Sequence, residues 1–163
     1  MSLHDAPLQA LLLPFDSGVL PWPAQGDIVF LGARTGGPLS GCPLDRLCCE
    51  QDFKPLADGL RQAGLAVSVE AEPVAEAALV LVLPPRQREQ ARALLARAVA
   101  LAAPGARVVV AAANDEGARS HEKDLRQLAG LGGSLAKFHS RVFWTPPLQG
   151  AHDAALLARW HQA

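Results

Sequence analysis

The sequence has few cysteines and no long apolar run, and we expect no secretory leader. A helix that spans a bilayer needs roughly 18 consecutive apolar residues, and no segment approaches that length. Half of the residues are hydrophobic and 19% are charged, which is the composition of a globular domain whose core needs no disulfide or metal. We therefore expect one cytoplasmic domain over residues 1–163, with no membrane contact.

Cysteine and histidine are too scattered to form a metal site. The cysteines are Cys42, Cys48 and Cys49, and neighbouring residues on a strand point to opposite faces. An odd, crowded set is typical of reduced thiols in the core of a cytosolic protein. The histidines lack metal-ligand spacing, and we expect them to be surface residues. They are His4, His121, His139, His152 and His161.

Known catalytic motifs are missing as well. There is no Gly-x-Ser-x-Gly elbow and no Walker loop. The pairs Ser120-His121 and His139-Ser140 are neighbours in sequence and do not amount to a catalytic triad. The sequence therefore predicts no catalytic residue in this chain.

Charge is distributed unevenly along the chain. Residues 1–84 contain ten acidic and four basic residues, whereas residues 85–163 contain eleven basic and six acidic residues. Such asymmetry suggests a basic face that could meet nucleic acid. The alternative is that the fold scatters these charges over a solvated surface.

Hydrophobic patterning predicts an alternation of strands and helices. The predicted strands are 27–31, 46–49, 66–70, 78–83 and 107–113, followed by an antiparallel pair at 134–138 and 141–144. The predicted helices are 52–63, 86–103, 114–129 and 154–160, the last within a closing segment at 148–163. This order predicts an α/β fold with a mostly parallel, Rossmann-like sheet and a closing hairpin, as in class I methyltransferases.

Prolines and small polar residues predict how these elements begin. Residues 1–25 carry several prolines, which lack the amide that a central strand needs, and they predict an extended N-terminal arm. Asp52 is the predicted cap of the first helix, and Asn114 or Asp115 is the predicted cap of the third.

A nucleotide-type cofactor would lie at the carboxyl ends of the parallel strands. The turn after the first strand contains Gly32, Gly36 and Gly37, but prolines break the segment where a helix would have to follow. Glu50 ends the second strand, where an acidic side chain can hold ribose hydroxyls. These residues are weak candidates for cofactor binding. The alternatives are an ordinary glycine-rich turn and a solvated carboxylate.

The segment Leu83-Pro84-Pro85-Arg86 closes the fourth strand and is the most informative negative feature. It resembles the Asn/Asp-Pro-Pro-aromatic motif of methyltransferases that act on exocyclic amines. In that motif the polar side chain accepts a hydrogen bond from the amine and the aromatic ring stacks on the base. Leu83 cannot accept a hydrogen bond and Arg86 has no aromatic ring, so the motif is degenerate here.

A further stretch carries a family resemblance. Residues 113–120, with the sequence Ala-Asn-Asp-Glu-Gly-Ala-Arg-Ser, precede a polar helix and then residues 137–144. Together they resemble the end of the amino-terminal domain of small-subunit ribosomal RNA guanine-N2 methyltransferases, and the resemblance covers about residues 11–146. In the family that the sequence resembles, each chain contains two copies of one methyltransferase fold. The amino-terminal copy is degenerate and assists RNA binding and folding, whereas the carboxyl-terminal copy binds S-adenosylmethionine.

By this resemblance the chain is an inert first half with no cofactor of its own, and residues 148–163 lead into an absent catalytic domain. Its expected partners are that carboxyl-terminal domain and ribosomal RNA, and S-adenosylmethionine is expected for the full-length enzyme. Two alternatives stay open. One is a stand-alone Rossmann-like enzyme with a nucleotide-type cofactor, and the other is a purely structural interaction domain.

Basic side chains are the candidate contacts to RNA or to another domain. Arg119, Lys123 and Arg126 share one helix face and could meet phosphates, while Arg86 and Arg88 form a second, weaker candidate group. Alternatively, acidic neighbours pair with Arg119, Lys123 and Arg126 and make a solvated face. Those neighbours are Asp115, Glu116, Glu122 and Asp124. We expect the nearby aromatic residues to belong to the sheet core. They are Phe138, Phe143 and Trp144.

Overall fold

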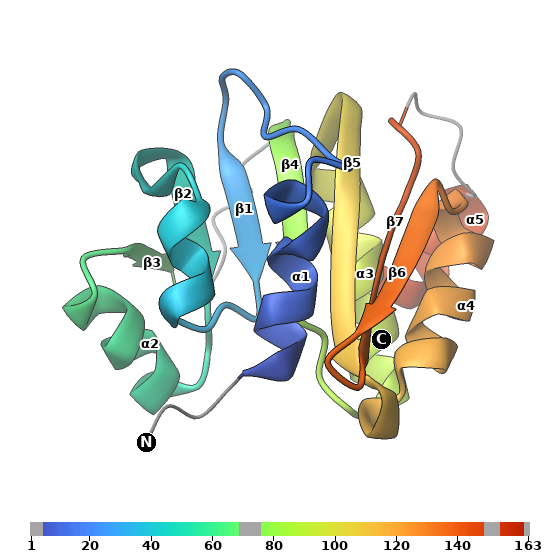
Figure 1. The fold of residues 1–163 in the computed structure, drawn as a ribbon. Helices are drawn as coiled ribbons and strands as arrows, with labels where there is room; N and C mark the ends of the chain where they lie inside the picture. Colours follow the sequence, from blue (N-terminus) through green and yellow to red (C-terminus); the bar gives the residue numbers. More distant parts are fainter. Residues whose placement is uncertain (1–4, 69–75, 149–153, 162–163) are drawn as a thin grey trace.

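A computed structural model describes residues 5–68, 76–148 and 154–161, which form a seven-stranded sheet with helices on both faces (Figure 1). The strands are β1 (Ile28–Leu31), β2 (Leu47–Glu50), β3 (Ala66–Ser68), β4 (Ala77–Val82), β5 (Ala102–Ala113), β6 (Gly133–Lys137) and β7 (Ser140–Trp144). Their order is β3-β2-β1-β4-β5-β7-β6. Pairing is parallel except that β7 runs antiparallel to both β5 and β6. The predicted Rossmann-like fold with a closing hairpin is confirmed.

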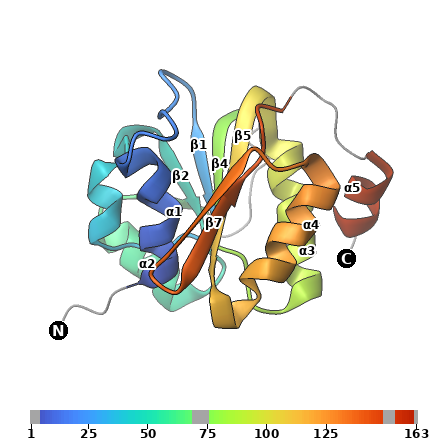
Figure 2. The ribbon, with the colours of Figure 1, turned by 45° about the vertical axis from the view of Figure 1, so that its right-hand side comes forward.

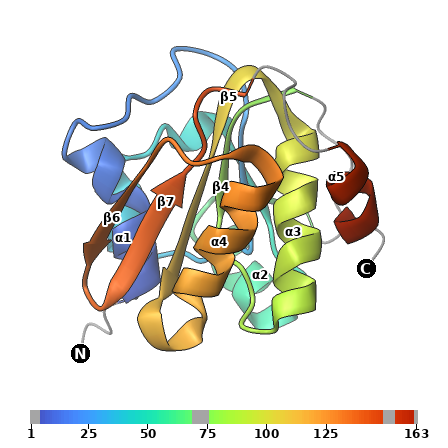
Figure 3. The same cartoon turned by 90° about the vertical axis from the view of Figure 1, so that its right-hand side faces the viewer.

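Helices pack on both faces of this sheet. The helices are α1 (Ala6–Asp16), α2 (Lys54–Gln62), α3 (Arg88–Leu101), α4 (Ala118–Ala129) and α5 (Ala154–His161). Figures 2 and 3 show α1 on one face and α3, α4 and α5 on the other. The predicted terminal helix is confirmed, and the end of the predicted third strand, residues 69–70, lies outside the described residues.

Two separate hydrophobic cores result from the alternation of side chains along the central strands. Phe30 and Leu81 point into the core beneath α1, whereas Leu31 and Val82 point into the core beneath α3, α4 and α5. All four side chains are fully buried. The apolar runs of β1 and β4 are therefore explained by a sheet that is covered on both faces.

The predicted extended arm at 1–25 is wrong, because much of this segment is the helix α1. Asp5 caps the helix by accepting a hydrogen bond from Leu8 N at 3.3 Å, and Pro7 lies in the first turn, where a missing amide costs little. Pro14 does stand inside the helix. The burial of an apolar face that includes Leu11 outweighs the hydrogen bond lost there.

β5 begins earlier than the sequence predicts. Pro104-Gly105 predicts a break between a helix at 86–103 and a strand at 107–113, but α3 ends at Leu101 and β5 starts at Ala102. The pairing of β5 with β4 shifts register around this proline. The missing amide of the proline therefore falls in an irregular part of the ladder, where it interrupts no regular pair.

Neither predicted helix cap is present. The side chain of Gln51, and not that of Asp52, accepts the hydrogen bond from Phe53 N before α2, at 3.0 Å. Residues 114–116 form a short 3-10 turn, and Gly117 precedes α4 with a φ of 89°. Glycine adopts this left-handed conformation without a steric penalty, so a glycine turn takes the place of a polar cap.

Candidate functional site

The candidate positions predicted after β1, β2 and β4 meet at one pocket. This pocket has a volume of about 740 Å³ and lies at the carboxyl ends of these strands, between α2 and α3. Gly32, Glu50 and the segment Leu83-Pro84-Pro85 line it. Gly36 and Gly37 do not, so the structure brings together only part of the predicted cofactor turn.

Gly32 serves the packing of the chain itself. Its φ is 70°, and a Cβ atom at this position would lie 2.3 Å from the carbonyl oxygen of Leu83. The glycine is therefore required because the ends of β1 and β4 approach each other closely. After it, Gly37 opens a 3-10 helix (Gly37–Gly41) instead of an α-helix, so no α-helix N-terminus points from this turn towards the pocket.

Glu50 is engaged by a partner that the sequence did not suggest. The guanidinium of Arg97, on α3, donates a hydrogen bond to Glu50 Oε2. The side chain of Glu50 is only 14% exposed and that of Arg97 is 25% exposed. Both residues line the pocket. The second carboxylate oxygen, Oε1, and Arg97 Nη2 are buried without a hydrogen-bond partner. A ribose would have to compete with this ion pair for the carboxylate.

The Leu83-Pro84-Pro85-Arg86 segment lacks the chemistry of an amine-binding motif. Leu83 is 6% exposed and belongs to the core beneath α1. Arg86 is exposed and donates a hydrogen bond to the carbonyl oxygen of Asp115 at 3.3 Å. This part of the pocket therefore offers no side-chain acceptor and no aromatic ring to a nucleobase.

These residues do not fit S-adenosylmethionine, the cofactor that the fold implies. The carboxylate that would hold ribose hydroxyls is in an ion pair with Arg97, and the turn after β1 leads into no α-helix. The residues at the pocket thus support no methyl-transfer step.

The cations of α4 are exposed, as their helical spacing predicts. Arg119, Lys123 and Arg126 all lie on the outer face of the helix. Within the described part of the chain, no ion pair involves any of the three. They are therefore available to an anionic partner.

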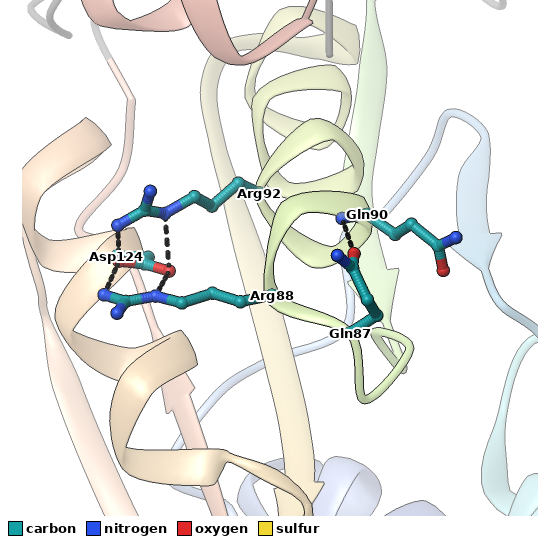
Figure 4. A network of polar contacts seen from close by, with 5 residues as sticks. All are labelled: Gln87, Arg88, Gln90, Arg92 and Asp124. Carbon is teal, nitrogen blue, oxygen red and sulfur yellow. Dashed lines mark hydrogen bonds and ion pairs between the residues drawn. The ribbon is translucent and has the colours of Figure 1, made fainter.

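The acidic residues of α4 have other partners than the sequence suggested. Asp124 is fully buried and accepts hydrogen bonds from Arg88 and Arg92 of α3, with closest distances of 2.8 and 3.1 Å (Figure 4). Glu122 accepts two from Arg141 of β7, at 2.9 and 3.2 Å. These ion pairs join α4 to α3 and to β7 and leave its outer cations unpaired.

Arg88, a weaker candidate contact to RNA or to another domain, is part of this network. Its guanidinium contacts Asp124 through two nitrogens, and its side chain remains 47% exposed. Burial alone would raise the pKa of Asp124, but hydrogen bonds from Arg88 and Arg92 bring it below its ordinary value. The aspartate is therefore ionised at neutral pH.

Two side chains differ in burial from their predictions. His121, expected on the surface, is only 1% exposed, and neither of its ring nitrogens has a hydrogen-bond partner. Burial lowers the pKa of His121 below its ordinary value. Phe138, expected in the core, is exposed at the tip of the β6–β7 hairpin, whereas Phe143 and Trp144 are buried as predicted. His4 and His152 lie outside the described residues.

The cysteines are free, and Cys42 and Cys49 are buried. Burial raises the pKa of both thiols to about 12, so neither is a thiolate at neutral pH. No group of three or more metal-ligating side chains occurs in the portions of the chain that the structure covers. In these portions, no helix is long and apolar enough to cross a membrane.

No protein-family model and no curated protein matches this sequence. Solved structures do match. The T. thermophilus 16S rRNA N2 G1207 methyltransferase RsmC, in complex with AdoMet and guanosine, aligns with a TM-score of 0.69 at 18% identity over 92% of this chain. The N-methyltransferase NodS from Bradyrhizobium japonicum (TM-score 0.65, 13% identity) covers 90% of this chain and all of its own. A TehB-like SAM-dependent methyltransferase from Corynebacterium glutamicum (0.62, 13%) covers 88% and 89%.

The chain therefore has the fold of the class I S-adenosylmethionine-dependent methyltransferases, with all seven strands in the order 3-2-1-4-5-7-6. RsmC is a 16S rRNA methyltransferase, and this chain spans only 41% of the length of that enzyme. At such low identity these similarities establish the fold alone.

Proposed function

We propose that this chain is a non-catalytic methyltransferase-like domain that binds RNA on behalf of an S-adenosylmethionine-dependent guanine-N2 methyltransferase domain. The observation that carries the proposal is the state of the pocket. Its carboxylate is held by Arg97, and a buried Leu83 stands where an amine acceptor would be needed. The fold is retained, while the described residues of the pocket offer an ion-paired carboxylate and a leucine at the positions where ribose and amine would be held.

RNA as the partner is supported by the unpaired cations of α4, since phosphate contacts need exposed guanidinium and ammonium groups. The likeness to RsmC supports the same partner, because that enzyme acts on 16S rRNA. The partner domain of this proposal supplies the cofactor and the chemistry. Localisation in the cytoplasm, where ribosomal RNA is found, is part of the proposal.

Calorimetric titration with S-adenosylmethionine tests the inactivity of the pocket. We expect no heat of binding from this chain, because Glu50 is in an ion pair and the turn after β1 offers no α-helix N-terminus. A catalytically active class I methyltransferase titrated under the same conditions serves as the control. Micromolar affinity, or methyl transfer by this chain alone, contradicts the proposal.

A second candidate function is a stand-alone enzyme that binds a nucleotide-type ligand. The pocket volume of about 740 Å³ and the buried, unpartnered Glu50 Oε1 favour it. Native mass spectrometry of the purified protein distinguishes the two candidates, since a co-purified small molecule supports this one. A third possibility, a purely structural domain, predicts no affinity for RNA even at low salt.

A further inference from the structure

Phe138 is an aromatic residue held in an exposed position. Among the described residues, only two aromatic side chains are exposed, Phe53 at 59% and Phe138 at 36%. The other aromatic rings lie in the cores or pack against them. Exposed rings are the groups with which proteins stack unpaired bases, so these two positions merit comparison.

The backbone at Phe138 is unfavourable for this residue type. β6 and β7 are joined by a two-residue turn, because Lys137 pairs with Ser140. Both turn residues have positive φ, 59° at Phe138 and 53° at His139. This is the pattern of a type I′ turn, which strongly favours Asn-Gly. A bulky aromatic residue in such a turn costs stability, and its benefit therefore has to come from outside the fold.

A cation lies over the ring of Phe138, and further cations are on the neighbouring helix α4. The ammonium of Lys137 lies 5.4 Å from the centre of its ring. On α4, Glu122 contacts Arg141 of β7, and the exposed Arg119 and Arg126 lie three and four residues from Glu122, about one helical turn away in each direction. The helix that carries these cations lies beside β7 of the hairpin (Figure 3).

Acidic residues are present near this surface but do not cover it. Asp115 and Glu116 are exposed in the turn that follows β5, beside the hairpin, where Asn114 N bonds to His139 O at 2.9 Å. Arg86 reaches the carbonyl oxygen of Asp115 and adds a cation there. The charged groups beside the hairpin turn are therefore of both signs, and the cation that lies over the ring is Lys137.

The surroundings of Phe53 are different. Asp52 precedes it, and Lys54, which follows it, is held by Asp58 at 2.8 Å. Phe53 is therefore an exposed ring without a free cation from its sequence neighbours. This makes it a matched control for Phe138.

We propose that Phe138 stacks on an unpaired base of single-stranded RNA, with Lys137 and the α4 cations Arg119, Lys123 and Arg126 contacting the adjacent phosphates. This inference rests on the proposed RNA-binding function and assigns that function its base contact. An aromatic ring combined with cations favours single-stranded RNA over a duplex, whose bases are already stacked.

The test measures binding of a short fluorescein-labelled single-stranded RNA of mixed sequence, and of the same RNA in a duplex, by fluorescence anisotropy at low salt. Phe138→Ala and Phe138→Leu should lower affinity for the single strand at least about fivefold, and Phe138→Trp should retain it within about twofold. Affinity for the duplex should change little. Phe53→Ala should bind both RNAs as the unmodified chain does.

Phe138→Asn adds a second readout. Asparagine suits the turn, so this variant should unfold at a higher temperature while losing affinity for the single strand. If the unmodified chain binds RNA and Phe138→Ala or Phe138→Leu binds it equally well, the stacking role is wrong but RNA binding stands. If the unmodified chain binds no RNA at low salt, both this inference and the RNA-binding function fail.

Discussion

Asp124 is fully buried, and two guanidinium groups reach its carboxylate from partly exposed positions on α3 (Figure 4). A buried carboxylate is stable only when its hydrogen bonds replace those to water. Here Arg88 and Arg92 supply them, and the contact joins α4 to α3. Asp124 therefore contributes to the attachment of the helix that carries the unpaired cations.

Asp124→Asn should destabilise the protein by about 2 kcal/mol, because the amide carries no charge and can satisfy the two guanidinium groups only in part. Chemical unfolding in urea measures this change. Asp115→Asn, at an exposed position, is the control and should stay within about 0.5 kcal/mol. Equal stability of the two variants would show that the network contributes little.

His121 makes stability depend on pH. Its pKa in the folded protein is lowered by burial from the ordinary 6.5, although the Asp124 carboxylate beside it acts in the opposite direction. Just below pH 6.5 the unfolded chain therefore binds a proton that the folded chain does not, and stability falls as the pH drops through this range. Unfolding at about pH 7.5 and about pH 5.5 should show the loss.

His121→Leu should make that loss smaller, since the variant has no group to protonate at this position. His139→Gln, which removes an exposed imidazole, is the variant for comparison. The carboxylate of Asp124 does not interfere with this comparison, because its own pKa lies below 3.8. An unchanged pH dependence in His121→Leu would contradict the assignment.

Substitution by alanine should have opposite effects on stability at Gly32 and at Gly59. Gly32→Ala should cost about 2–4 kcal/mol, because its Cβ would meet the Leu83 carbonyl oxygen at 2.3 Å and its φ is 70°. Gly59 lies within α2 with no atom within 4 Å of an added Cβ. Gly59→Ala should therefore raise stability by about 0.5–1 kcal/mol. Thermal or urea unfolding measures both.

At the scale of elements, α4 combines two inward ion pairs with an outward basic face. Its acidic residues Glu122 and Asp124 hold the helix against β7 and α3. The outward cations are consequently not neutralised by acidic groups of their own helix. Because these ion pairs hold α4 in place, its outward cations are presented on a fixed helix.

The triple variant Arg119→Ala, Lys123→Ala, Arg126→Ala should weaken binding of all RNA sequences alike. It should also flatten the dependence of log affinity on log salt by about 2, since each phosphate contact to a single strand contributes about 0.7. Anisotropy over a salt series measures this slope. Arg61→Ala on α2 is the control, because Arg61 pairs with Asp58, and it should leave the slope unchanged. An unchanged slope in the triple variant would exclude these phosphate contacts.

The elements that the sequence predicted well are those whose burial pattern is local. The apolar runs of β1, β4 and β5 and the closing hairpin could be located because each carries its own periodicity. α1 could not, since its prolines argue against a helix and only its packing on the sheet explains it. The predicted helix caps were wrong for a related reason. Gln51 and Gly117 act at the helix starts through local backbone geometry, which composition does not reveal.

The candidate site shows the same division. That Leu83, Glu50 and Gly32 converge follows from the parallel arrangement of their strands, and the sequence could predict it. Arg97 was missed, because it pairs with Glu50 across 47 positions of the chain. The exposure of Phe138 was missed because the run 134–138 reads as core strand. A two-residue gap before the next strand was the available signal for a turn there.

At the scale of the whole molecule, the sheet separates two layers, one containing α1 and the other containing α3, α4 and α5. Each layer has its own hydrophobic core, and the sheet lies between the two cores. All helices of the second layer lie in the half of the chain in which basic residues predominate. The uneven charge of the sequence thus becomes an uneven distribution of charge between the layers of the molecule.

The pocket is an exception to this separation. It is lined by Leu56 of α2, a helix whose Leu60 belongs to the core beneath α1, and by Leu94 of α3, which packs against the other core. A ligand bound between these two side chains would contact both layers and restrain their motion relative to each other. Binding of such a ligand would slow amide hydrogen exchange in both layers, even without a large change in structure.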